Sequence, residues 1–271
     1  MADYLALARA CRSENQFNRL HIDLDRTLAP LEIAAIRKVA DTQGFPRAGR
    51  AWLKTVEEQS PTLFAAPEPF ERQAIHDNLA LYRGGSRRDR ARLLIAFTGI
   101  ARRLMIPTAS FLQALDARDW DVALVKNAGS FLDGAEGLAS DLDGLLRVVS
   151  AKVGPNRYAS VTVFGVSSGG GPAIVAACRL GARRGVSMCG SSGERLLGTS
   201  VRPHLWPLLM RRRPELVYVH GAGNETDREA AGAMAASWGG STLPVDGVQS
   251  HNVMGSLLKR GLLKGFLAGT L

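Results

Sequence analysis

The chain has 271 residues, of which 46% are hydrophobic and 22% charged, and its formal net charge is +9. This balance is typical of one large folded domain, or of a domain with an extension, and no window holds the roughly 18 uncharged apolar residues of a membrane span. The first residues, MADYLALARA, lack the basic leader of a signal peptide, which predicts a cytoplasmic protein.

Three cysteines are spread along the chain. Cys11, Cys178 and Cys189 are odd in number and far apart, which indicates neither a disulfide framework nor a CxxC metal site. Cys178 and Cys189 lie in apolar surroundings and are predicted to pack in a core. The sequence therefore predicts no structural metal.

The first 78 residues are predicted to be mainly helical. Apolar residues at helical spacing begin near Leu5, Leu20, Pro30 and Ala48. Pro30 suits the first turn of a helix, because the N–H that proline lacks would be unpaired there. We therefore expect a helical N-terminal extension over residues 1–78 and a separate domain over residues 79–271.

From residue 79 onwards, short apolar runs alternate with helical segments. The predicted strands lie at residues 79–82, 93–99, 122–125, 161–166, 186–189, 216–220 and 242–245. Continuous apolar strands that alternate with helices predict an α/β fold with a mostly parallel central sheet, flanked by helices. The first two runs are compatible with a hairpin that gives this sheet an antiparallel edge.

The segment GVSSG, which follows the apolar run SVTVF, is a G-x-S-x-G pattern between a predicted strand and a predicted helix. A serine on such a turn has strained backbone, and the residues two before and two after it pass too close for side chains. Gly165 and Gly169 meet that need on either side of Ser167. A phosphate-binding loop is the alternative, but no Lys-Ser or Lys-Thr follows and GxGxxG is absent. We therefore expect a nucleophile elbow with Ser167 as the nucleophile.

A nucleophilic serine needs a base and an acid that orients the base. In a sheet of this kind the acid and then the histidine follow the serine along the chain. His251 comes after the last predicted strand, where the base is expected. Asp227 and Glu225 both follow the preceding strand, and Asp227 is favoured, although it also suits the first turn of a helix. Asp246 is a third candidate for the acid.

An oxyanion that forms during acyl transfer needs backbone N–H donors. One donor is expected from Ser168, which follows the nucleophile at the start of a helix. The second is expected from Gly99, after the strand at residues 93–99. The sequence HGAG at residues 220–223 also resembles an oxyanion motif, but it comes after the nucleophile and is rejected.

Four segments together resemble the α/β-hydrolase family: AFTG after one strand, GVSSG after a central strand, GAGNETD after a late strand, and QSHN before the last helix. The resemblance covers residues 79–271. It implies Ser167 as nucleophile, His251 as base and Asp227 as acid, with ester, thioester or amide substrates and no cofactor. Asn224 stands at the usual position of the acid, a departure that also admits an inactive relative.

Three functions remain open from the sequence. The first is a serine hydrolase or acyltransferase, and the second is a binding or scaffolding protein that keeps the fold without its chemistry. The third is nucleic-acid binding, which rests on charge alone, because no basic run is interleaved with aromatic residues. Basic runs such as residues 87–92 and 211–213 favour an acidic substrate, for example an acyl-carrier protein, a coenzyme thioester or an anionic glycan.

Overall fold

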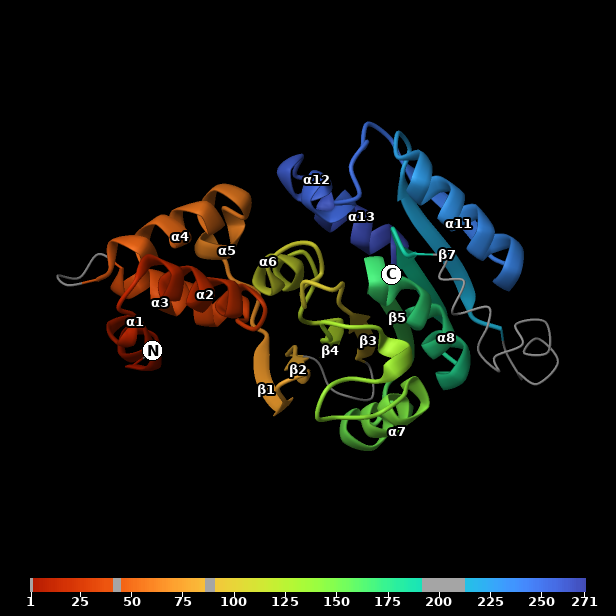
Figure 1. Ribbon diagram of the computed structural model, residues 1–271, viewed down its shortest axis with the longest axis horizontal. Coiled ribbons are helices and arrows are strands. Elements are labelled where there is room, and N and C mark those ends of the chain that lie inside the picture. The colour runs from red at the N-terminus through yellow and green to blue at the C-terminus, as the bar shows by residue number, and fades with distance from the viewer. Residues whose placement is uncertain (1, 41–44, 86–90, 192–212) are drawn as a thin grey trace.

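The computed structural model describes residues 2–40, 45–85, 91–191 and 213–271 (Figure 1). At the centre of this part lies an eight-stranded sheet in the order β1-β2-β4-β3-β5-β6-β7-β8. The strands are β1 (Glu71–His76), β2 (Leu79–Arg83), β3 (Arg92–Phe97), β4 (Trp120–Val125), β5 (Ser160–Val166), β6 (Arg184–Met188), β7 (Glu215–Gly221) and β8 (Ser241–Val245). Strand β2 is antiparallel to β1 and β4, and every other neighbouring pair is parallel. The predicted mostly parallel sheet is therefore confirmed.

Two details at the β1 edge of the sheet differ from the sequence-based expectation. Strands β2 and β3 do not form a hairpin, because β4 lies between them and pairs Val125 with both Leu79 and Phe97. Residues 71–76, predicted to be helical, form the edge strand β1. Most of its side chains are exposed, so it carries little apolar signal, and its pairing with β2 decides its conformation.

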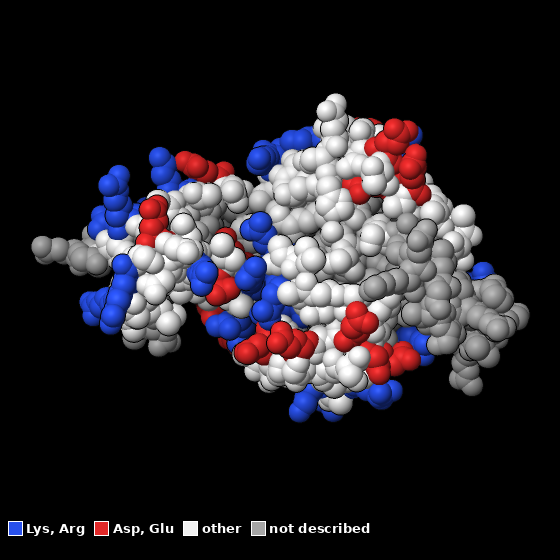
Figure 2. Space-filling view, in the orientation of Figure 1, with Lys and Arg blue, Asp and Glu red and all other residues white. Residues whose placement is uncertain are grey.

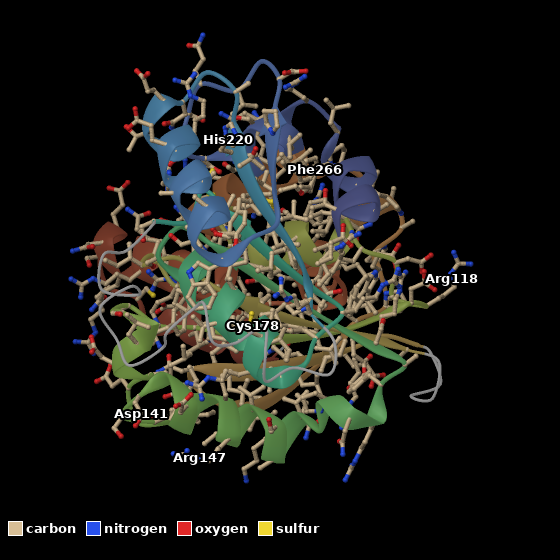
Figure 3. All side chains as sticks on the ribbon, turned by 90° about the vertical axis from the view of Figure 1, so that its right-hand side faces the viewer. Arg118, Asp141, Arg147, Cys178, His220 and Phe266 are labelled. Atoms are coloured by element: carbon tan, nitrogen blue, oxygen red, sulfur yellow. The ribbon has the colours of Figure 1, made fainter. Side chains whose placement is uncertain are left out.

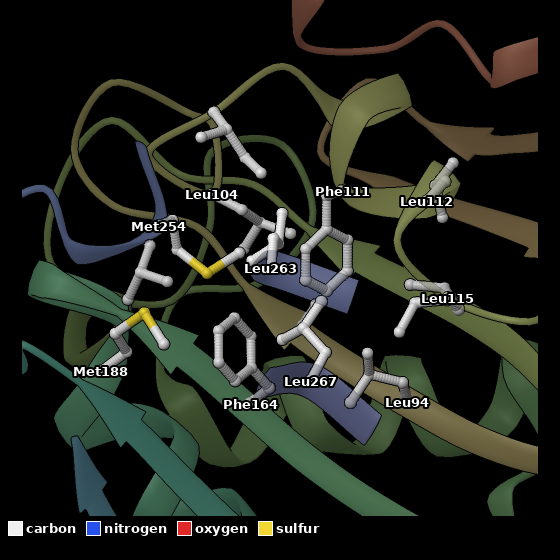
Figure 4. Close-up of a cluster of buried hydrophobic side chains, with 14 of the residues drawn as sticks. Leu94, Leu104, Phe111, Leu112, Leu115, Phe164, Met188, Met254, Leu263 and Leu267 are labelled. Atoms are coloured by element: carbon white, nitrogen blue, oxygen red, sulfur yellow. The ribbon is translucent and has the colours of Figure 1, made fainter. Parts of the chain in front are cut away.

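Helices cover both faces of the sheet. One face is covered by α6 (Thr108–Gln113), α12 (Val253–Lys259) and α13 (Leu263–Thr270), and the other by α7 (Leu142–Val153), α8 (Gly170–Leu180) and α11 (Glu225–Trp238). Figure 4 shows the first core, where Phe111 of α6 stacks on Phe164 of β5 with ring centroids 5.8 Å apart. Figure 3 shows Cys178 on α8, in the second core, and its predicted burial is confirmed.

Central strands are buried on both faces, which explains their continuous apolar runs. In β3, Leu94 and Ala96 belong to one core, while Leu93, Ile95 and Phe97 belong to the other. Side chains alternate between the faces of a strand, so both sets must be apolar when helices cover both sides. The helix-covered parallel sheet is thus already encoded in the hydrophobic pattern of the chain.

The N-terminal helices pack beside the sheet, next to β1 and α6 (Figure 1). They are α1 (Ala2–Ala10), α2 (Glu14–Asp25), α3 (Pro30–Val39), α4 (Arg47–Gln59) and α5 (Thr62–Ala65). They share a core of their own, which includes Ile33, Leu53 and Leu63. Contacts such as the hydrogen bond from the Tyr82 hydroxyl to the Thr27 carbonyl, 2.6 Å, join these helices to the sheet.

Basic side chains are spread over the molecule. On the face in Figure 2, Lys and Arg side chains are scattered over the N-terminal helices and over the rest of the described chain, and Asp and Glu side chains lie among them. Several members of the two basic runs noted in the sequence lie outside the described residues, namely Arg87, Arg88, Arg90, Arg211 and Arg212. Among the helices that the structure does describe, none has both the length and the hydropathy to cross a membrane.

Candidate active site

Ser167 occupies a sharp turn between β5 and α8. Its φ angle is +51°, in the left-handed region that non-glycine residues rarely adopt. A Cβ on Gly165 would lie 2.1 Å from the Gly169 carbonyl oxygen, and one on Gly169 would lie 2.5 Å from the Thr98 carbonyl oxygen. Neither position has room for a side chain. The turn therefore has the strained, glycine-flanked geometry expected of a nucleophile elbow.

Replacing Gly165 with alanine is expected to lower the free energy of unfolding by about 3 kcal/mol, because the new methyl group would meet backbone atoms that cannot rotate away. Gly232→Ala is the matched control. Gly232 lies within α11, and a Cβ there would meet no other atom within 4 Å, so alanine is expected to add about 0.5–1 kcal/mol through higher helix propensity. Urea denaturation of both variants measures the difference. A Gly165→Ala protein as stable as wild type would contradict the close packing of the turn.

Three side chains from distant segments meet beside this turn. The Nε2 atom of His251 lies 3.0 Å from the Ser167 hydroxyl oxygen, and its Nδ1 atom lies 2.8 Å from an oxygen of Asp227. An ionised carboxylate only accepts hydrogen bonds, so in the tautomer that carries its proton on Nδ1, this N–H donates to Asp227 and Nε2 can accept the serine proton. Asp227 is 6% exposed, whereas half of the His251 side chain is open to solvent. The arrangement has the order and connectivity of a Ser-His-Asp triad.

The first turn of α11 supplies the carboxylate. Asn224 is the N-cap residue of this helix, and its side-chain oxygen accepts a hydrogen bond from the Asp227 N–H at 3.1 Å. Both sequence-based expectations for Asp227 are therefore met by one residue. It lies in the first turn of a helix, and its buried side chain contacts the histidine that was expected to pair with the acid. Glu225 points outward and forms an ion pair with Arg228 at 2.9 Å. The structure brings Asp227, and neither Glu225 nor Asp246, to His251.

Cys189, which was predicted from the sequence only to pack in a core, lies next to Asp227 and His251. It is 2% exposed, directly follows β6, and has a φ of +50°. Its sulfur, a ring nitrogen of His251 and an oxygen of Asp227 all lie within 4.8 Å of one another, a donor set that could hold a metal ion. Burial and the Asp227 carboxylate raise the pKa of the thiol, which disfavours the thiolate that a metal would need. The position of Cys189, directly after a central strand, was the sequence feature that could have placed it near the site.

Of the two predicted oxyanion donors, the Ser168 N–H is unpaired within its helix, whereas the Gly99 N–H is already hydrogen-bonded. Ser168 lies in the short 3-10 helix Ser167–Gly169, at a position whose N–H has no partner within the helix. The Gly99 N–H already donates to the Arg103 carbonyl at 3.1 Å, so the prediction that Gly99 is a free donor is wrong. The Arg102 N–H also donates to the Gly99 carbonyl at 2.9 Å and forms a tight turn. Because of this turn, the Gly99 N–H points into the loop. In the described part of the chain, the next amide, that of Ile100, makes no hydrogen bond.

Comparison by sequence finds no matching family model and no matching curated protein. Comparison with solved structures finds many similar folds. FphF from Staphylococcus aureus, a fluorophosphonate-binding serine hydrolase, matches with a TM-score of 0.52 and 13% identity over 73% of this chain and 98% of that one. MenH from S. aureus matches with a TM-score of 0.50 and 12% identity over 72% of this chain and 97% of that one. At these identities the likeness concerns the fold alone, and together with the strand order it shows that the chain has the α/β-hydrolase fold.

Proposed function

We propose that the protein is a serine hydrolase that cleaves a carboxylic ester or thioester through an acyl-serine intermediate. The observation that carries this proposal is the continuous hydrogen-bonded path from Ser167 through His251 to Asp227, with contacts of 3.0 Å and 2.8 Å. The strained glycine-flanked turn at Ser167 supports it, because strain of this kind persists where function requires a fixed side-chain direction.

The proposed reaction uses Ser167 as nucleophile, His251 as base and Asp227 as acid. The Ser167 oxygen attacks the acyl carbon while its proton passes to Nε2 of His251, and Asp227 stabilises the resulting imidazolium. The oxyanion of the tetrahedral intermediate accepts hydrogen bonds from the N–H groups of Ser168 and Ile100. The C–O or C–S bond then breaks, and the leaving group takes the proton from His251. Water, deprotonated by His251, attacks the acyl-serine, and the acid is released with the serine restored.

The substrate class is proposed from charge. A net charge of +9 favours an anionic acyl donor, either a small molecule or an acyl group on an acidic carrier. An acyltransferase would use the same acyl-serine with an acceptor hydroxyl in place of water. The inactive alternative rested on Asn224 at the usual acid position, and it loses support because Asp227 reaches His251 from the following turn. A cytoplasmic location stays a prediction from the sequence.

A fluorophosphonate probe tests the proposal, because only a serine activated by a base reacts with it readily. We expect the folded wild-type protein to be labelled and the adduct to be located on Ser167 by mass spectrometry. Heat-denatured protein and the Ser167→Ala variant are the controls, and neither is expected to react. An unlabelled folded protein, or an adduct on another residue, would contradict the proposed mechanism.

A further inference from the structure

The loop that carries the Ile100 amide has an unusual backbone. It runs from Gly99 to Ile106 after β3, and two of its non-glycine residues have positive φ angles, Arg102 at +60° and Met105 at +65°. Backbone of this kind is strained and persists only where surrounding contacts hold it. The position of the Ile100 N–H therefore depends on what holds the Gly99–Ile106 loop.

Helix α2 of the N-terminal extension supplies one of these contacts. Arg26, the C-cap residue of α2, donates from Nε to the carbonyl oxygen of Ala101 at 2.9 Å. Its Nη1 atom pairs with Asp23 at 3.0 Å, which orients the planar guanidinium towards the loop. Ala101 directly follows Ile100, so Arg26 restrains the backbone immediately beside the amide assigned to the oxyanion.

Two further contacts hold the same loop from the sheet side. The Arg102 guanidinium donates to the side-chain oxygen of Asn78, which lies between β1 and β2. The Asn252 side-chain amide donates to the Met105 carbonyl at 3.3 Å, and Asn252 directly follows the catalytic histidine. The loop is thus tied to the sheet, to the segment of the base and, through Arg26, to the N-terminal helices.

We propose that the N-terminal helices are part of the catalytic apparatus, and that Arg26 is a positioning residue that holds the Gly99–Ile106 loop with the Ile100 N–H aimed at the oxyanion. This inference rests on the proposed acyl-serine chemistry. The negative charge on the former carbonyl oxygen develops only in the transition state. Loss of the positioning contact should therefore lower kcat and leave substrate binding nearly unchanged.

The Arg26→Ala variant tests this role. We expect kcat for an activated ester to fall by about tenfold or more, towards the 10²–10³-fold effect of removing an oxyanion donor, with KM changed by less than about twofold. Arg19→Ala, which replaces an exposed arginine on the same helix, is the control. It is expected to stay within about threefold of wild type, because an exposed side chain away from the loop contributes little.

A second readout separates positioning from general destabilisation. Sulfur accepts hydrogen bonds more weakly than oxygen, so the rate ratio of an ester to its thionoester reports on the oxyanion donors. We expect this ratio to fall in Arg26→Ala while the melting temperature and the circular dichroism spectrum show a folded protein. If the wild-type protein is active and Arg26→Ala has the same rate ratio and the same kcat, the role of Arg26 is overturned while the proposed function stands. A wild-type protein without esterase activity or probe labelling would overturn the proposed function, and this inference with it.

Discussion

The Ser167→Ala variant is expected to turn over ester substrates about 10⁴- to 10⁶-fold more slowly than the wild-type protein, because the acyl-serine can no longer form. Removing the hydroxyl leaves the rest of the triad in place, since the Asp227–His251 contact does not depend on it. Steady-state hydrolysis of p-nitrophenyl esters measures the loss. Residual activity above about one per cent of wild type would mean that another group is the nucleophile.

The same position also allows a stability test of the elbow. Alanine keeps the cost of a positive φ at residue 167, whereas glycine removes it. Ser167→Gly is therefore expected to be about 1 kcal/mol more stable to unfolding than Ser167→Ala, while both are inactive. Urea denaturation of the two inactive proteins makes the comparison without any contribution from substrate. Equal stabilities would contradict the strain assigned to the turn.

The Asp227→Asn variant is expected to lower kcat by about 10⁴-fold. An asparagine amide cannot stabilise the imidazolium, and its side-chain N–H would favour the tautomer of His251 that cannot accept the serine proton. The carboxylate is buried and lies 2.8 Å from Nδ1. Initial rates for the purified variant, compared with its melting temperature, separate lost chemistry from lost folding.

Glu225→Gln is the matched control for the acid. Glu225 is two residues earlier in the same helix, and its carboxylate is exposed and paired with Arg228 rather than with His251. Its replacement is expected to leave kcat within about twofold, as is usual for a surface ion pair. Activity lost in Glu225→Gln and kept in Asp227→Asn would show that the acid was assigned to the wrong residue of this turn.

The proximity of Ser167 and His251 could be predicted from the sequence, because it follows from the glycine pattern and from the order of the strands. Glycine is the only residue that fits the backbone at positions 165 and 169, on either side of Ser167, whatever the rest of the fold does. His251 was found by its order along the chain, since parallel strands deliver their following loops to one edge of the sheet. The apolar strands carried their own evidence of burial on both faces.

Other features were decided only by tertiary contacts. Strand β1 is polar and becomes a strand through pairing with β2, and the choice of Asp227 over Glu225 depends on which way one helical turn faces. The Gly99 N–H, predicted to face the oxyanion, is instead paired with the Arg103 carbonyl because the loop bends back on itself. The direction of a side chain or an N–H depends on segments far away in the sequence, and a local pattern records where a group lies along the chain but not where it points.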